Sequence, residues 1–370
     1  MDHAGRLRRL QASLSNHKLD SLLISHLPNV YYLCGFTGSA AALLVAKHGS
    51  VLFTDGRYTT QATEELKSAN VDASIVIARK SPVLSAAECL AARPRGSKRQ
   101  PLTLGIEPES ISAGMRDRLT AALKGRMKVR LRSAPPLVER ARMVKDSTEI
   151  ARIRRAVELG ARLFRIARQK IRPGVSEVEV AAAMEYEARC SGAEGMSFPT
   201  ILASGTRSAV VHGRASSAHI PRSGFVVCDF GVILAGYCSD RTRTVHVGRC
   251  SREARQLYEA VLEAQQAAIA AVRPGAAAAE VDSAARRVLR KRKLARYFTH
   301  STGHGLGLEI HEAPRLAAGQ AQKLEPGMVI TIEPGVYVPG KWGVRIEDVV
   351  VVTSSGCEVL TPTDKELVVI

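Results

Sequence analysis

Two stretches of the chain carry the same arrangement of acidic residues, and this duplication strongly constrains the fold. The first reads VVCDFGVILAGYCSDRTRTV and the second reads VITIEPGVYVPGKWGVRIEDVVV. In each, an apolar strand runs to a carboxylate, Asp229 or Glu333, turns through glycine and returns as a strand with a second carboxylate, Asp240 or Glu347. Four carboxylates that meet in one core repel one another strongly unless cations offset their charge. The pairing therefore predicts a site for two divalent metal ions.

The segments that precede these stretches are also related to each other. Residues 171–183 read IRPGVSEVEVAAA and residues 272–284 read VRPGAAAAEVDSA, at an offset of 101 residues. The offset from Asp229 to Glu333 is 104 residues, so both features belong to one repeat. In each copy Pro-Gly ends one helix and a new helix begins, and Ser176 with Glu179 forms a capping-box pattern in the first. The sequence predicts a duplicated helix–helix–hairpin unit with its site between the halves.

The N-terminal part alternates short apolar strands with helical patterns and predicts an α/β layer with a mixed sheet. A long amphipathic helix at 146–168 opens the second part, and the change of pattern near 135–145 divides the chain into domains 1–140 and 141–370. The composition of residues 92–101, ARPRGSKRQP, predicts a loop. Strands are expected at 21–25, 41–46, 51–54, 73–77 and 102–106, and helices at 1–17, 58–67, 82–92 and 110–124.

Composition excludes several classes of protein. The basic N-terminus lacks the apolar run of a signal peptide, and no stretch reaches the roughly 18 apolar residues of a membrane span. Seven scattered cysteines without a C-x-x-C pair disfavour a disulfide framework and suit a cytoplasmic location. The net charge of +18 comes from arginines at helical spacing, and only 4% of residues are aromatic, so nucleic-acid binding is not expected as a primary role.

Three histidines complete the set of candidate site residues. His304 stands between two glycines in GHGLGLEIHEAP, where the backbone can approach neighbouring chain closely, and the nearby acids favour a role as metal ligand. His311 lies seven residues further on, and His212 follows an apolar pair in SAVVHGRAS. These two are candidates for polarising a substrate carbonyl or stabilising an oxyanion, or for buried histidines bonded to backbone.

The ordered motifs DFG, GYCSDRTRT, GHGLGLEIHEAP, TIEPGVY and GVRIEDVV resemble the metallopeptidase family of prolidase, aminopeptidase P and methionine aminopeptidase. The resemblance implies the pita-bread fold, with internal pseudo-twofold symmetry, for the C-terminal domain. YLCGFTGSA and FTDGRY are similar to the creatinase-type domain that precedes it in prolidase and aminopeptidase P. The expected fold class is therefore α/β (α+β), with a creatinase-like N-terminal domain.

The resemblance implies a role for each of the five expected metal ligands. Asp229 would chelate one ion, and His304 with Glu333 would bind the other. Asp240 and Glu347 would bridge the two. Oxygen-rich ligation with a single imidazole favours Mn²⁺, with Co²⁺ and Zn²⁺ as alternatives. All five positions are filled, which disfavours a non-catalytic pita-bread binding module.

The same resemblance extends to substrate-contacting residues. His212 and His311 match the family's histidines around the metal and substrate. Arg345 stands two residues before the second bridging acid and would support the ligands or the substrate, and Arg315 matches an arginine that binds the dipeptide carboxylate in some prolidases. Arg207 occupies a position where many relatives carry asparagine.

The expected activity is cleavage of a small peptide with proline at the second position. A hydroxide that bridges the two metal ions would attack, and Glu333 would pass a proton to the leaving nitrogen. An Xaa-Pro dipeptidase is the principal hypothesis, and an Xaa-Pro aminopeptidase (aminopeptidase P) that acts on longer peptides is the alternative. The resemblance also implies a homodimer.

Overall fold

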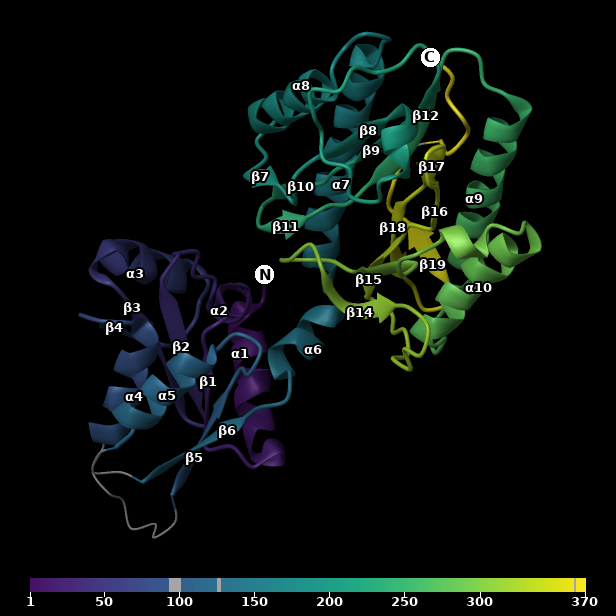
Figure 1. The fold of residues 1–370 in the computed structure, drawn as a ribbon. Helices are drawn as coiled ribbons and strands as arrows, with labels where there is room; N and C mark the ends of the chain where they lie inside the picture. Colours follow the sequence, from purple (N-terminus) through teal and green to yellow (C-terminus); the bar gives the residue numbers. More distant parts are fainter. Residues whose placement is uncertain (93–100, 125–127, 363) are drawn as a thin grey trace. The chain divides into compact units, whose positions relative to one another are not determined.

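The computed structural model describes residues 1–92, 101–124, 128–362 and 364–370, and the chain forms two compact units. Unit 1 spans Met1–Arg142 and unit 2 spans Met143–Ile370 (Figure 1). Most of the loop expected at 92–101 lies outside the described residues. Within the described residues, no helix combines the length and the apolar character needed to cross a membrane.

Unit 1 is built on a mixed sheet with the strand order β4-β3-β2-β1-β5-β6. The β1–β2 and β2–β3 pairs are antiparallel, and the remaining neighbours are parallel, which confirms the predicted mixed α/β layer. One face packs on helices through buried residues such as Leu23, Phe53, Leu90 and Leu119. The strands are β1 (Ser21–Ile24), β2 (Ala41–Ala46), β3 (Gly49–Thr54), β4 (Ser74–Ile77), β5 (Leu102–Ile106) and β6 (Val129–Ser133).

Four helices of unit 1 lie close to their predicted ranges, and α2 and α6 are additions. Helix α2, which has Pro28 in its first turn, falls in a segment that the sequence leaves unassigned, as does strand β6. The N-terminal helix is α-helical to Ser13 and continues as a short 3₁₀ turn to His17. The helices are α1 (His3–Ser13), α2 (Leu27–Cys34), α3 (Thr59–Ser68), α4 (Pro82–Ala92), α5 (Ala113–Ala122) and α6 (Leu137–Met143), the last of which ends at the boundary between the units.

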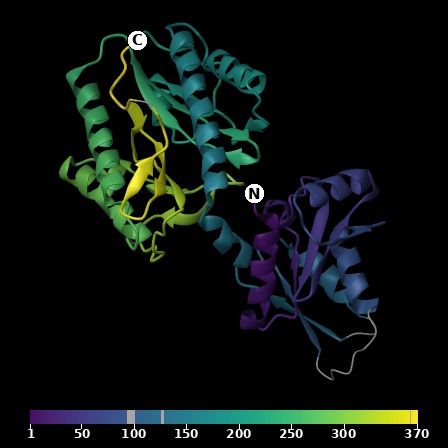
Figure 2. The same cartoon turned by 180° about the vertical axis from the view of Figure 1, so that it is seen from behind.

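Unit 2 contains two helix pairs that reflect the sequence repeat. Helix α7 (Ser147–Lys170) packs with α8 (Glu177–Cys190), and α9 (Arg252–Ala271) packs with α10 (Ala278–Lys291) (Figure 2). Helix α8 starts with the predicted capping box, in which Ser176 and Glu179 bond reciprocally. The second helix of each pair has 14 residues, and the two begin 101 residues apart.

The two acidic stretches form equivalent antiparallel pairs in unit 2. Strand β9 (Gly224–Asp229) pairs with β12 (Thr242–Val247), and β15 (Val329–Ile332) pairs with β18 (Asp348–Val352). A short excursion separates the strands of each pair: β10 (Val232–Leu234) with β11 (Tyr237–Cys238), and β16 (Gly335–Val338) with β17 (Trp342–Arg345). Strands β7 (Gly195–Met196), β8 (Ile201–Ser204), β13 (Gly303–Gly305), β14 (Glu312–Leu316) and β19 (Cys357–Val359) complete the sheets.

Each half of unit 2 has its own hydrophobic core. In the first half Phe164 of α7 and Met184 of α8 pack on Val226 and Val245 of the β9–β12 pair. In the second half α9 and α10 pack in the same way on β15 and β18. Because successive strand residues face opposite sides, packing one face on the helices leaves the other face of each pair for the polar residues of the site.

Candidate metal centre

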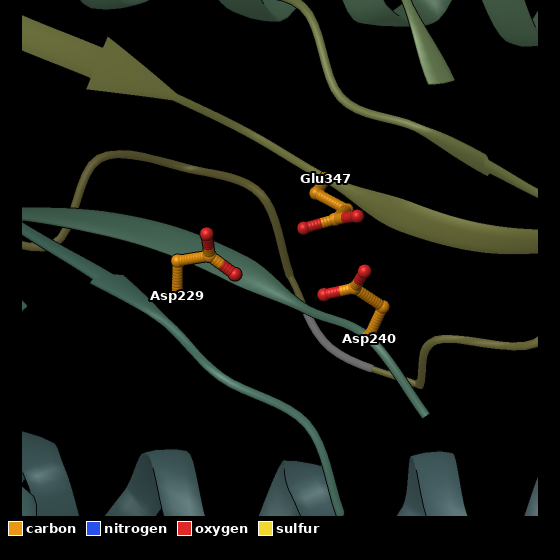
Figure 3. Close-up of side chains that lie close together, drawn as sticks. All are labelled: Asp229, Asp240 and Glu347. Carbon is orange, nitrogen blue, oxygen red and sulfur yellow. The ribbon is translucent and has the colours of Figure 1, made fainter. Parts of the chain in front are cut away.

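Three carboxylates meet where the two halves of unit 2 face each other (Figure 3). Asp229 is the last residue of β9. The sequence predicts Asp240 and Glu347 within the return strands, but both lie just before those strands, β12 and β18. One oxygen from each of the three lies within 4.8 Å of the others. All three side chains are buried, although isolated carboxylates are almost never fully buried.

His304 and Glu333 extend this cluster on one side. His304 Nε2 lies 3.4 Å from Glu333 Oε1 and 3.6 Å from Asp240 Oδ2. The flanking Gly303 permits this placement, since a Cβ atom there would lie 1.9 Å from the backbone oxygen of Thr331. The structure therefore brings all five expected ligands into one cluster.

Burial and mutual repulsion govern the ionisation of the cluster. Desolvation, followed by the neighbouring carboxylates, raises the pKa of Asp240 and of Glu347 well above the ordinary range. Desolvation is also the largest effect on Glu333 and raises its pKa to about 8. Burial lowers the pKa of His304 to about 4, so its imidazole is neutral at pH 7 and offers a lone pair to a cation.

The carboxylate oxygens divide into those that the protein holds and those that it leaves available. Thr242 Oγ1 donates to Glu347 Oε2 at 2.7 Å, and the Arg345 guanidinium donates to Asp229 Oδ2. Within the described residues, neither Asp229 Oδ1 nor Glu347 Oε1 has a hydrogen-bond partner, although both are buried. Such atoms are costly unless a further group satisfies them. Hard divalent cations prefer oxygen ligands of this kind, so the residues fit the metal ions that the sequence predicts.

The cluster forms one wall of a cavity of about 870 Å³ in unit 2. His212 and His311 line this cavity, and the ring centroids of His304 and His311 lie 4.4 Å apart. Arg315 pairs with His304 in the β13–β14 register and lines the cavity too. Such a volume lies within the range of small-molecule sites. All nine expected site residues line it: His212, Asp229, Asp240, His304, His311, Arg315, Glu333, Arg345 and Glu347.

Arg345 is directed at protein groups. Its Nε donates to Thr242 Oγ1 at 3.0 Å, its Nη1 donates to Val211 O at 3.1 Å and Tyr337 Oη at 2.6 Å, and its Nη2 donates to Asp229. With the side chain 3% exposed, this guanidinium is a fixed positive charge beside the cluster. The geometry places Arg345 as a support for Asp229.

His300 and Tyr337 contact the expected site residues, although the sequence patterns do not single them out. His300 lines the cavity, and its Nε2 lies 3.0 Å from Tyr337 Oη, which also accepts from Arg345. Burial lowers the pKa of His300 to about 4 and raises that of Tyr337 to about 12, so both are neutral over a wide pH range. His300 precedes His304 by four residues in HSTGH, and this proximity is the sequence signal that could have found it.

A duplicated α/β unit with a carboxylate and histidine cluster that opens to a small-molecule cavity has the features of a metal-dependent enzyme. Residues 151–354 match Metallopeptidase family M24, and residues 6–144 match the Creatinase/Prolidase N-terminal domain. The chain belongs to this metallopeptidase family and is a peptidase with a pita-bread catalytic domain.

Relatives match the chain over nearly its whole length. The Xaa-Pro dipeptidase of Pyrococcus horikoshii is 36% identical over 98% of this chain and 98% of its own length. The structure of an Xaa-Pro dipeptidase from Bacillus anthracis superposes with a TM-score of 0.91, at 36% identity and full coverage of both chains. That of an X-Pro aminopeptidase from Thermotoga maritima has a TM-score of 0.85 at 35% identity, and covers 97% of this chain and 100% of the other.

Proposed function

We propose that the protein hydrolyses Xaa-Pro dipeptides with two divalent metal ions. The observation that carries this proposal is the five-residue cluster around three buried carboxylates, in which Asp229 and Glu347 each keep one oxygen without a partner among the described residues. The similarity to Xaa-Pro dipeptidases supports the choice of substrate.

Five residues would hold the ions. Asp229 would serve one ion and His304 with Glu333 the other, while Asp240 and Glu347 would be shared. When bound, the ions would supply Lewis acidity and a nucleophile derived from water near neutral pH. Four carboxylates with one imidazole favour Mn²⁺, with Co²⁺ and Zn²⁺ as alternatives.

Glu333 is the residue that we assign to proton transfer. The nitrogen of a proline leaving group carries no N–H before cleavage and has to gain a proton as the bond breaks. Glu333 is 17% exposed at the cavity wall and lies beside His304, so its carboxyl can hold and deliver a proton there.

The histidines and Arg315 would bind and orient the peptide. Burial lowers the pKa of His311, so a neutral ring N–H is available near pH 7 to donate to the substrate carbonyl oxygen as it gains negative charge. His212 faces the same cavity and would act with it. Arg315, exposed in the cavity, would pair with the free carboxylate of a dipeptide.

The proposal is tested with single substitutions of the shared ligands. Asp240→Ala and Glu347→Ala should each lose bound metal and turnover of Xaa-Pro dipeptides, as followed by metal analysis and proline release. Glu325→Gln, at an exposed carboxylate of the same unit, should retain both properties. Full metal content and activity in either alanine variant would refute the shared role.

Substrate length separates the two candidate activities. A panel of Xaa-Pro dipeptides and Xaa-Pro-Xaa tripeptides should show preferential turnover of the dipeptides. An Xaa-Pro aminopeptidase is the second candidate, supported by the Thermotoga maritima structure. Turnover of tripeptides alone would replace the dipeptidase assignment.

Quaternary structure and location complete the proposal. The family resemblance supports a homodimer, which light scattering after size-exclusion chromatography would measure as twice the chain mass of 39.8 kDa. All seven cysteines are free, which supports a reducing, cytoplasmic environment. Cell fractionation would test that location.

A further inference from the structure

A buried glutamate at the start of α8 holds both ends of the segment that carries His212. Glu177 is fully buried, and its Oε1 accepts from the backbone nitrogen of Ser204 at 2.8 Å and from Ser204 Oγ at 2.9 Å. Its Oε2 accepts from the backbone nitrogen and Oγ of Ser216, at 3.2 Å and 2.7 Å. One carboxylate therefore joins the two ends of residues 204–216.

Arg207, which lies within residues 204–216, adds further contacts that hold this segment. Its Nε lies 3.2 Å from Glu177 Oε2, and its Nη2 donates to the backbone oxygen of Arg214 at 2.8 Å. Arg207 is 35% exposed at the side chain, whereas its partner is completely buried. Since His212 lies between residues 207 and 214, the pair restrains the backbone on both sides of that histidine.

A buried aspartate of α10 plays a corresponding part in the second half. Asp282 is 1% exposed, and its Oδ1 accepts from Thr302 Oγ1 at 2.8 Å and from the Thr302 backbone nitrogen at 3.2 Å. The backbone oxygen of Thr302 in turn accepts from the Glu333 nitrogen at 2.8 Å. His304 follows two residues later, so Asp282 acts on the backbone of two expected ligands of the same ion.

Arg286 reinforces this contact one helical turn later. Its Nε lies 2.8 Å from Asp282 Oδ2, and its two terminal nitrogens donate to the backbone oxygens of Phe298 and His300, at 3.2 Å and 2.6 Å. The pair thereby holds the segment that leads into the HSTGH motif. The position equivalent to Glu177 in α10 is Ala278, 101 residues on, so the second half uses a different position for the carboxylate.

We propose that the Glu177–Arg207 and Asp282–Arg286 pairs are positioning devices with separate tasks. The first orients the substrate-contacting His212, and the second sets the His304 and Glu333 side of the metal centre. The inference rests on the proposed function, because it assigns each pair to one part of that site.

If the two ion pairs only stabilised the fold, removal of either pair would lower the stability of unit 2 without a separate effect on metal binding or on substrate kinetics. Separate tasks predict a different outcome. Loss of a group that orients a metal ligand typically costs about 10–100-fold in metal affinity. Loss of the Asp282 pair should therefore weaken one of two metal sites, whereas loss of the Glu177 pair should change substrate kinetics and leave metal binding intact.

The experiment titrates the metal-free full chain with Mn²⁺ by calorimetry. The wild type should bind two ions. Asp282→Asn and Arg286→Gln should each bind one ion with wild-type affinity and the second about 10–100-fold more weakly. Arg286 is 29% exposed, so its variant keeps the test available if the aspartate variant does not fold.

Steady-state kinetics on Mn²⁺-loaded protein completes the comparison. Glu177→Gln and Arg207→Gln should bind two ions as the wild type does but show about a tenfold or larger fall in kcat/KM, and Arg207→Lys should recover part of the loss by restoring a cation beside Glu177. Arg292→Gln is the matched control, because Arg292 forms an exposed ion pair with Glu263 just after α10. It should match the wild type in both assays.

The outcomes separate failure of this inference from failure of the proposed function. A wild-type chain that binds fewer than two ions would overturn the proposed function itself. Two tight sites in the wild type and equally tight sites in folded Asp282→Asn and Arg286→Gln would overturn the inference alone. Weakened metal binding in Glu177→Gln and Arg207→Gln would also overturn it, because the two pairs would then lack separate tasks.

Discussion

Removal of the metal ions should make the stability of unit 2 fall as the pH rises towards 8. Glu333 has its pKa raised from 4.5 to about 8 in the folded chain, chiefly by burial. Between these values the metal-free folded state retains a proton that the unfolded state has released. A group with a raised folded pKa stabilises the fold at low pH, and this contribution is lost as the pH passes through the folded value.

The size of the effect follows from proton linkage. One extra bound proton in the folded state lowers the free energy of unfolding by about 1.4 kcal/mol for each pH unit. Asp240 and Glu347 also have raised pKa values and add slopes of the same sign. His304 has its pKa lowered from 6.5 to about 4, so its contribution is lost only as the pH falls below 6.5. Burial also lowers the pKa values of His246, His300 and His311, so the opposite slope of these four rings fades above pH 6.5 and the carboxyl groups set the slope towards pH 8.

The single tryptophan provides the measurement. Trp342 lies in β17 and packs against the core of the second half, so its fluorescence reports the unfolding of unit 2. Urea unfolding in a chelator, at several pH values from 6.5 to 8, should give a free energy that falls by at least about 1.4 kcal/mol per unit. Glu333→Gln should flatten the slope by about that amount. Saturating Mn²⁺ should abolish the fall, since bound cations keep the folded carboxylates ionised.

A free energy that stays level or rises over this window in the metal-free protein would refute the reasoning. The acids would then be no harder to ionise in the folded chain than in the unfolded one. An unchanged slope in Glu333→Gln would refute the assignment of the effect to that residue.

Two further substitutions test the surroundings of the site. Gly303→Ala would place a Cβ atom 1.9 Å from the backbone oxygen of Thr331, so we expect about 1–3 kcal/mol of destabilisation in urea unfolding and weaker Mn²⁺ binding. Gly356→Ala is the control, because a Cβ atom there would have nothing within 4 Å, and it should leave stability unchanged. Equal behaviour of the two variants would contradict the steric argument. Lys145→Met removes the buried ammonium group that lies 3.0 Å from Glu312 Oε2, and should lower the free energy of unfolding in urea by about 3–5 kcal/mol. It should also lower kcat/KM, because Glu312 lines the cavity. Unchanged stability would show that this ion pair is not required.

Much of the fold follows from local patterns in the sequence. The capping box at Ser176 and Glu179 starts α8 as predicted, and the alternation of strands and helices in unit 1 predicts its mixed sheet. Helix α2 was missed because LPNVYYLC is rich in residues that also suit strands, and packing within unit 1 decides its conformation. Local pattern alone does not contain that information.

Sequence motifs predict some residues of the site, whereas other contacts in the site depend on the three-dimensional packing. Spacing and glycine flanks are enough to single out Asp229 and His304 as candidate ligands. The bond between His300 and Tyr337 joins residues 37 positions apart, and that between Asp282 and Thr302 joins residues 20 apart. Such partners depend on how the strands and helices pack, so one sequence does not predict them.

Asp229 and Glu347 belong to different halves of unit 2 and are 118 residues apart in the chain. Contacts between distant segments form late in folding, because closing a long loop costs entropy before the contact can stabilise anything. The metal centre can assemble only after both halves have folded. Added ions should therefore leave the folding rate nearly unchanged and slow unfolding, so that the metals protect the finished peptidase kinetically without guiding its formation.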